Sequence, residues 1–222
     1  MIGPVVVTDV SKTYRLGKLA VTALSEVSLT VAAGEFLAIA GPSGSGKTTL
    51  LNLIGCLDTP TSGEVEIDGE RVSTLSPGQR ADLRARKLGF VFQTFNLIPV
   101  LTAYENVEYA LLIRRRGGDT ATRVHAALEQ VGLSDRAAHR PSELSGGQQQ
   151  RVAIARALVG DPALVLADEP TANLDSHTGQ EIVELMRRLN HERGTTFVFS
   201  THDPRIMKAA DRMLEISDGR LR

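Results

Sequence analysis

The sequence predicts an α/β fold with a mostly parallel sheet, and two observations lead to this prediction. Short apolar segments with the length of buried strands alternate with segments whose apolar residues repeat at helical spacing. Polar residues suited to chemistry follow several of these strands: Lys47, Gln93, Asp168, Glu169 and His202. Because ligands of such sheets bind beyond the carboxyl ends of the strands, we expect these side chains to share one site.

The bulk properties of the chain fit a large domain or a core with a subdomain. It has 222 residues, 42% of them hydrophobic, and a formal net charge of −1. This near-neutral charge predicts neither a nucleic-acid partner nor direct attraction to an anionic membrane. The single cysteine, Cys56, is expected to be a small buried apolar residue. A signal peptide and an 18-residue apolar span are not apparent, so we expect a cytoplasmic protein that meets the membrane only through a partner.

The first third of the chain is expected to be rich in strands. Apolar residues alternate with polar or small ones over 27–31, as on a half-buried strand. Residues 36–40 form a continuous apolar run, which suits a strand that is buried on both faces. Residues 63–69 are a strand between turn residues, and residues 88–92 are a further strand that ends before Gln93.

The next segment, residues 94–157, predicts a mostly helical insert. Three helices are expected, over 102–116, 120–131 and about 145–160. Thr102 and Glu105 have the spacing of a capping box, and Gly132 suits a helix stop. The arginines at 114–116 are expected to lie in a solvated loop.

Strands and helices alternate again after this insert. Residues 163–167 are apolar and end at Asp168, and residues 196–200 are a strand that ends before His202. Between them, Ser176 is expected to cap a helix with an apolar face. The chain thus divides into an α/β core, residues 1–93 and 158–222, and the helical insert.

A glycine-rich loop between the strand over 36–40 and a helix that begins near Thr49 carries a phosphate-binding motif. Its residues are Gly41, Pro42, Ser43, Gly44, Ser45, Gly46, Lys47 and Thr48. Glycines let backbone N–H groups close around phosphate oxygens, and the helix N-terminus adds partial positive charge. Lys47 is a point charge for the β- and γ-phosphates, and Thr48 offers its hydroxyl to Mg²⁺.

Two adjacent carboxylates at the end of a buried strand complete a candidate site for hydrolysis. Asp168 is suited to hold Mg²⁺, directly or through water, and Glu169 to accept a proton from an attacking water. A lone histidine is more often structural, but the position of His202 directly after a strand favours a functional role, in which it donates to the γ-phosphate.

A second anion site is predicted about a hundred residues after the phosphate loop, in the segment 144–148. Ser145, Gly146 and Gly147 can form a helix N-cap with free N–H groups, followed by Gln148. If the subunit's own nucleotide lies on its sheet, a γ-phosphate from another subunit is the simplest ligand. Two-fold symmetry would then give a homodimer with two sandwiched nucleotides.

Together these residues resemble the ATP-binding subunits of ABC transporters over nearly the whole chain. The matches are Gly41–Thr48 with the Walker A motif, Gln93 with the Q-loop, 144–148 with the signature, Leu164–Asp168 with Walker B, Glu169 with the catalytic glutamate, 173–175 with the D-loop and His202 with the switch histidine. The resemblance implies a P-loop NTPase core with an antiparallel β subdomain and a helical signature subdomain. It also implies that Gln93 bridges Mg²⁺ and the water, and that Tyr14 stacks on adenine.

Finer similarity comes from the segments 53–58 and 89–99, which resemble the lipoprotein-releasing and macrolide-exporter ATPases. The family implies an ATP hydrolase, peripheral on the inner face of the cell membrane, that powers an integral-membrane permease on a separate chain. One alternative is a regulatory ATPase that signals through a membrane partner to extracytoplasmic enzymes. Another is a DNA-repair or chromosome ATPase, which the near-neutral charge and the lack of room for a coiled coil disfavour.

Overall fold

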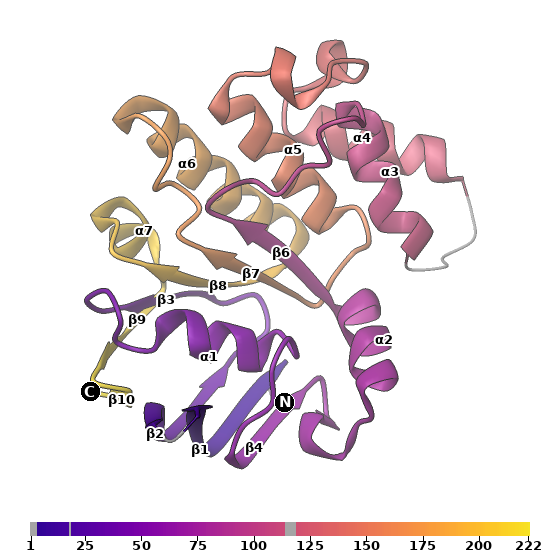
Figure 1. The fold of residues 1–222 in the computed structure, drawn as a ribbon. Helices are drawn as coiled ribbons and strands as arrows, with labels where there is room; N and C mark the ends of the chain where they lie inside the picture. Colours follow the sequence, from indigo (N-terminus) through magenta and orange to yellow (C-terminus); the bar gives the residue numbers. More distant parts are fainter. Residues whose placement is uncertain (1–3, 18, 114–118) are drawn as a thin grey trace.

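A computed structural model describes residues 4–17, 19–113 and 119–222, and in these residues the strands form two sheets (Figure 1). The larger sheet has the strand order β10-β9-β3-β8-β7-β6. Its strands are β3 (Phe36–Ala40), β6 (Leu88–Phe92), β7 (Leu164–Asp168), β8 (Thr196–Thr201), β9 (Arg212–Ser217) and β10 (Arg220–Leu221). All neighbours in it are parallel except β10 and β9. The predicted mostly parallel sheet is therefore confirmed.

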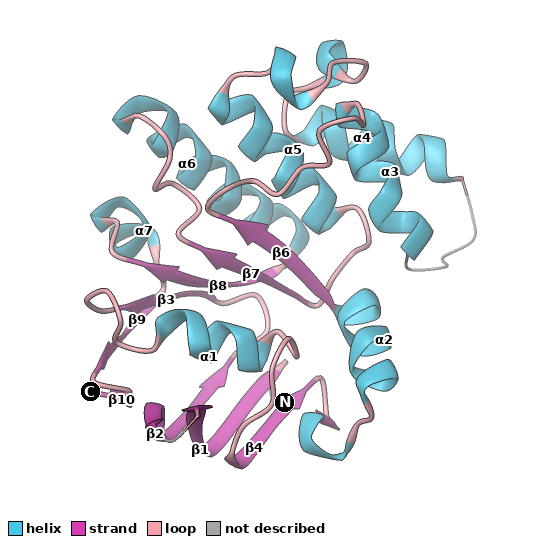
Figure 2. Cartoon of the chain, in the orientation of Figure 1, coloured by secondary structure: helices cyan, strands magenta, loops and turns pink. Residues whose placement is uncertain are grey.

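The smaller sheet is antiparallel and has the order β2-β1-β4-β5. Its strands are β1 (Val5–Leu16), β2 (Leu19–Val31), β4 (Ser62–Ile67) and β5 (Glu70–Arg71). Helix α1 (Lys47–Ile54) lies between the two sheets (Figure 2). One apolar core forms around it: Leu50 and Leu53 of α1 belong to the same buried cluster as Ile39 of the larger sheet and Val7 and Val65 of the smaller one.

A layer of helices lies on the opposite side of the larger sheet. These are α3 (Ala103–Ile113), α4 (Thr120–Gln130), α5 (Gly146–Leu158) and α6 (Ser176–Arg193), with the shorter α7 (Pro204–Ala209) beside them (Figure 1). Because successive side chains of a strand point to opposite faces of the sheet, neighbouring residues of one strand enter different cores. In β3, Phe36 belongs to the core under α5 and α6, whereas Leu37 belongs to the core around α1.

The helical insert contains the expected helices, with short 3₁₀ turns at Ser134–Arg136 and Pro141–Glu143. The predicted capping box at the first helix is present: the backbone N–H of Thr102 donates to Glu105 Oε2, and that of Glu105 donates to Thr102 Oγ1. The predicted end of that helix, at residues 114–116, lies outside the described residues. That the insert is a separate subdomain stays a prediction.

Two local features differ from the sequence-based expectation. The cap of α6 is Asp175 rather than Ser176, because the Asp175 carboxylate accepts from the N–H groups of His177 and Thr178 at 3.0 Å each. A carboxylate satisfies two free N–H groups there, and Ser176 becomes the first helical residue. Helix α2 (Pro77–Lys87) was not expected from the sequence; it begins with a capping box of Ser76 and Gln79 after a 3₁₀ turn at Val72–Thr74.

Candidate active site

The phosphate loop connects β3 to α1, and close packing explains its glycines. A Cβ at position 41 would lie 2.2 Å from the carbonyl oxygen of Ile216, and one at position 46 would lie 2.7 Å from that of Ala23. Gly46 also has a φ of 108°, which side chains rarely permit. The loop can therefore turn tightly into α1 only with glycine at these two positions, and it ends at the N-terminus of this helix, which suits an anion.

Lys47 is the first residue of α1 and is 8% exposed. Its Nζ folds back over the loop and donates to the carbonyl oxygens of Gly41 at 2.7 Å and Pro42 at 3.0 Å. The ammonium is thus held at the centre of the loop, where a phosphate of a bound nucleotide would find it.

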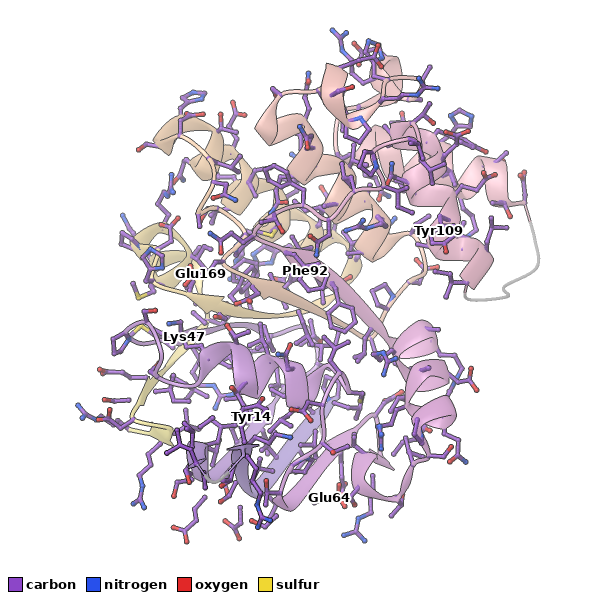
Figure 3. The ribbon with its side chains drawn as sticks, in the orientation of Figure 1. Tyr14, Lys47, Glu64, Phe92, Tyr109 and Glu169 are labelled. Atoms are coloured by element: carbon purple, nitrogen blue, oxygen red, sulfur yellow. The ribbon has the colours of Figure 1, made fainter. Side chains whose placement is uncertain are left out.

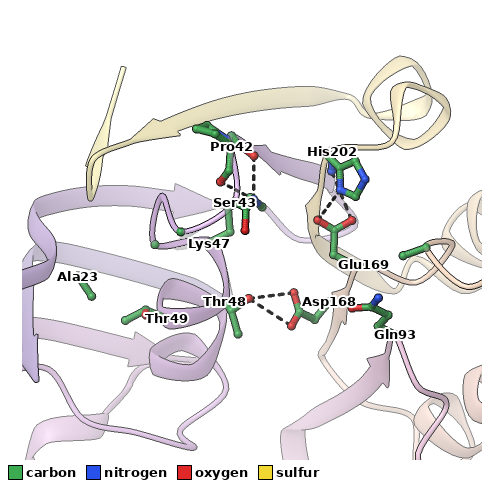
Figure 4. A pocket seen from close by; sticks show the side chains of 14 residues that line it. Ala23, Pro42, Ser43, Lys47, Thr48, Thr49, Gln93, Asp168, Glu169 and His202 are labelled. Atoms are coloured by element: carbon green, nitrogen blue, oxygen red, sulfur yellow. Dashed lines mark hydrogen bonds and ion pairs between the residues drawn. The ribbon is translucent and has the colours of Figure 1, made fainter.

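Strand β7 brings Asp168 to the phosphate loop, although the two are 120 residues apart (Figure 4). The hydroxyl of Thr48 donates to both carboxylate oxygens of Asp168 at 3.3 Å. A hydroxyl and a carboxylate at this separation suit Mg²⁺, which accepts oxygen ligands and completes its shell with waters and substrate phosphates. No three His, Cys, Asp or Glu side chains cluster as a metal site in residues 4–17, 19–113 and 119–222.

Glu169 directly follows β7 and is paired with His202, which directly follows β8. His202 Nδ1 lies 2.8 Å from Glu169 Oε1. A carboxylate oxygen accepts hydrogen bonds, so the ring nitrogen Nδ1 is the donor in this contact and Nε2 lies on the other side of the ring. Glu169 has a φ of 46°, an uncommon backbone conformation for a residue with a side chain, and its N–H donates to the Ser200 carbonyl at 2.9 Å. The pair is therefore fixed from both strands.

These groups meet in one cleft of about 630 Å³ (Figure 4). The cleft is lined by Ala23, Gly41, Pro42, Ser43, Gly44, Gly46, Lys47, Thr48, Thr49, Gln93, Asp168, Glu169, Ala172 and His202. Gln93 is exposed, and its carbonyl accepts from Asn173 Nδ2 at 3.0 Å. Ser45, although part of the phosphate loop, is buried and is not among the residues that line the cleft.

The structure places the other predicted site residues outside the lining of this cleft. Tyr14, in β1, is 37% exposed; its hydroxyl donates to Asp58 Oδ2 at 3.1 Å, and Lys12 Nζ lies 4.9 Å from its ring centre. Figure 3 shows Tyr14 on the smaller sheet, below α1, and Lys47 and Glu169 above it.

The segment from Ser145 to Gln148 also lies outside the cleft lining, at the start of α5. Ser145 and Gln148 form a reciprocal capping box at 2.9 and 3.3 Å. Gly147 packs on α6, where a Cβ would lie 2.4 Å from Thr178 Cγ2. The segment is thus a pre-formed helix N-terminus with Ser145 exposed.

Sequence reasoning missed Ala23 and Ala172, which line the cleft through small side chains that give no chemical signal. It also missed the polar group formed by Thr171, Asp203 and Arg205 behind Glu169 and His202. Asp203 directly follows the predicted histidine, and this position was the one available signal.

Comparisons with known proteins agree with this geometry. A family model described as ABC transporter matches residues 24–172. The chain is 51% identical over 211 residues to the lipoprotein-releasing system ATP-binding protein LolD of Bordetella pertussis, covering 95% of this chain and 91% of that protein. It is also 51% identical over 214 residues to the macrolide export ATP-binding/permease protein MacB of Syntrophobacter fumaroxidans, covering 95% of this chain but only 30% of that protein.

Among solved structures, the ATP-binding cassette MJ0796 of Methanocaldococcus jannaschii is similar over nearly the whole chain. Its dimer in a post-hydrolysis state, bound to ADP and Pi, has a TM-score of 0.90 and 47% identity, covering 98% of this chain and 96% of that one. The phosphate loop and the carboxylate–histidine pair beside it are consistent with the function that the names of these relatives state. The chain belongs to the ABC transporter family, in which it is an ATP-binding and ATP-hydrolysing subunit.

Proposed function

We propose that the chain binds Mg·ATP in the cleft, hydrolyses it between two subunits arranged head to tail, and drives an integral-membrane permease carried on a separate chain. The observation that carries this proposal is the convergence of Lys47, Asp168, Glu169 and His202 in one cleft. The LolD relative, whose length the chain nearly spans, is named as the ATP-binding protein of a lipoprotein-releasing system.

The roles of the residues follow from their positions. Backbone N–H groups of the loop from Gly41 to Thr49 hold the phosphates, and Lys47 exchanges its two carbonyl partners for phosphate oxygens. Thr48 and Asp168, with Gln93 across the cleft, would hold Mg²⁺, which neutralises phosphate charge when bound. We place adenine on the ring of Tyr14, on the face opposite Lys12.

Hydrolysis requires a water in line with the bond between the γ-phosphorus and the bridging oxygen to ADP. Glu169 accepts the proton of this water as its oxygen attacks phosphorus, and the bridging oxygen leaves with ADP. His202 holds the Glu169 carboxylate through Nδ1 and donates from the other side of its ring to the γ-phosphate only if Nε2 is protonated. The products are ADP and inorganic phosphate.

The signature segment completes the site from a second subunit. Ser145, Gly146 and Gly147 are not among the residues that line the cleft of their own chain, yet they form a helix N-terminus that suits an anion. A two-fold arrangement brings the segment of each subunit to the nucleotide of the other. The solved relatives that are described as dimers support this arrangement.

A groove of about 390 Å³ between α2, β6, α3 and α5 is our candidate surface for the permease. Its floor contains Phe90 and Phe92, whose rings stack 5.8 Å apart, and its rim contains Ile113 at 56% exposure. Exposed apolar side chains around such a groove suit an apolar helix of a partner. The described part of the chain has no helix with the length and apolarity of a membrane span.

Co-purification with membrane proteins tests this assignment. Ile113→Glu should release the permease while ATP hydrolysis by the isolated chain is retained, because the groove is separate from the cleft. Leu112→Glu is the matched control, since Leu112 is equally exposed but lies outside the groove lining. Equal release by both variants would contradict the groove as the docking surface. Recovery of a partner that regulates extracytoplasmic enzymes and transports nothing would favour the regulatory alternative.

A further inference from the structure

The loops that carry Glu169 and His202 are joined behind the cleft through Asp203, whose carboxylate forms a half-buried ion pair with Arg205 and accepts a hydrogen bond from Thr171. Asp203 directly follows His202 and is 8% exposed. Arg205 Nε donates to both carboxylate oxygens of Asp203, at 2.9 and 3.0 Å, and Arg205 Nη2 donates to Asp203 Oδ2 at 2.6 Å. Such multiple charge-assisted bonds fix geometry as well as adding energy.

A third side chain ties this pair to the loop of the catalytic carboxylate. The hydroxyl of Thr171, two residues after Glu169, donates to Asp203 Oδ2 at 2.5 Å in a buried position. Burial alone would raise the pKa of Asp203, but the hydrogen bonds from Arg205 and Thr171 outweigh burial and hold this pKa below its ordinary value. The carboxylate is therefore ionised at neutral pH and binds both loops at once.

Arg205 extends the connection to the start of α6. Its Nη1 donates to the carbonyl oxygen of Ser176 at 2.6 Å. The guanidinium lies flat against Gly179, where a Cβ would be only 2.4 to 2.7 Å from its atoms. Glycine at this position leaves the space that the arginine occupies. The segment from Thr171 to Ser176 is thus held at both of its ends by the Asp203–Arg205 pair.

The same segment also touches the remaining cleft loop, because Asn173 donates to the carbonyl of Gln93. We propose that Asp203 and Arg205 are positioning residues for ATP hydrolysis: they hold Glu169 and His202 in register with each other and with the segment 171–176. This proposal rests on the proposed roles of Glu169 and His202. Neither positioning residue needs to touch the nucleotide, since both act through the loops that they join.

If Asp203 and Arg205 position the catalytic groups, their loss should lower turnover without lowering ATP affinity. Arg205→Ala leaves the Asp203 carboxylate without its cation and loosens the two loops, while the phosphate loop between β3 and α1 is untouched. Misplacement of reacting groups by ~1 Å can reduce a rate by about 100-fold. We therefore expect kcat to fall by at least about tenfold on this scale, with unchanged KM and ATP affinity.

A set of variants separates positioning from mere stability. Thr171→Val keeps the shape of the side chain and removes only the hydroxyl bond, so it should lower kcat with little change in Tm. Arg205→Lys keeps the charge without the planar fork and should recover only part of the rate. Arg188→Ala is the control, because Arg188 is an arginine of α6 whose bonds go to Gln130 and Glu192 rather than to Asp203 or Arg205. It should retain wild-type turnover.

Three results would overturn the proposal: wild-type kcat in both Arg205→Ala and Thr171→Val; parallel losses of kcat and ATP affinity; or full recovery by Arg205→Lys. The expected result for Thr171→Val combined with Arg205→Ala is a loss smaller than the product of the two single losses, because both act through Asp203. Glu169→Gln distinguishes a failure of the proposed function from a failure of the positioning role of Asp203 and Arg205. If it hydrolyses ATP normally, the proposed function fails; if it is slow while Arg205→Ala and Thr171→Val are both normal, only the positioning proposal fails.

Discussion

Replacement of Lys47 by alanine should weaken ATP binding by a predictable amount. Lys47 is the one lysine or arginine among the described residues that line the cleft. Lys47 can donate one charge-assisted hydrogen bond to the β-phosphate and one to the γ-phosphate, and each contributes about 1.5–3 kcal/mol. Because Lys47 gives up two carbonyl partners, at 2.7 and 3.0 Å, to reach the phosphates, part of that gain is cancelled. A net loss of about 2–4 kcal/mol remains, which corresponds to roughly 30- to 1,000-fold in Kd.

Titration calorimetry with ATP and Mg²⁺ measures this loss directly. Lys208→Ala is the matched control, because Lys208 is an exposed lysine on α7 outside the cleft lining. A thermal melt shows whether the phosphate loop remains folded once its lysine no longer bridges it. Wild-type ATP affinity in a folded Lys47→Ala protein would refute the assignment of this cleft to the phosphates.

Three further outcomes are expected. Glu169→Gln should bind ATP but hydrolyse it about 10²–10⁴-fold more slowly, because the amide cannot take the proton of the water; a phosphate-release assay measures the rate, and unchanged release would exclude Glu169 as the base. Tyr14→Ala should weaken ATP binding by about 1–2 kcal/mol, as for bases that stack on aromatic rings; if the variant binds ATP as tightly as the wild type, Tyr14 is not part of the adenine site. Burial raises the pKa of the Cys56 thiol to about 11 from 9.0. The unfolded thiol therefore ionises first, so stability should fall as pH rises from about 9 towards 11, and Cys56→Ala should flatten this part of the pH–Tm curve.

The sequence predicted the strands that carry the site because those strands are buried on both faces. The run before Asp168 is continuous and apolar, as are residues 197–199 within β8, and Glu169 and His202 directly follow the ends of these two strands. Strand β1 was harder to predict. Its alternation from Val5 is broken by register shifts after Val7, next to Asp9 with its φ of 48°, so the period of two is lost within the strand.

Features that depend on contacts between distant segments were not accessible from the sequence. Asp203 was adjacent to a predicted site residue, yet its partner Thr171 is 32 positions away and shows no pattern of its own. Asp175 competes with Ser176 for the cap of α6, and the carboxylate wins because it accepts two N–H groups. In the proposed dimer, the position of the signature segment relative to a nucleotide depends on a second subunit and not on the fold of one chain.

The central claim is that each ATP site combines the phosphate loop of one subunit with the signature segment of the other. Ser145→Arg should leave ATP binding by the monomer intact and block closure, whereas Lys47→Ala spoils the opposite half of the site. In a mixed dimer, one site carries both defects and the other combines an intact Lys47 with an intact Ser145.

Energy transfer between labels on the two variant chains tests this claim most directly. The account predicts that ATP produces a dimer in the mixture of Ser145→Arg and Lys47→Ala, and little or none in either variant alone. If Ser145→Arg abolishes ATP binding by the isolated monomer, and mixing the variants yields no ATP-dependent energy transfer, the signature segment acts within its own chain and the head-to-tail dimer is contradicted.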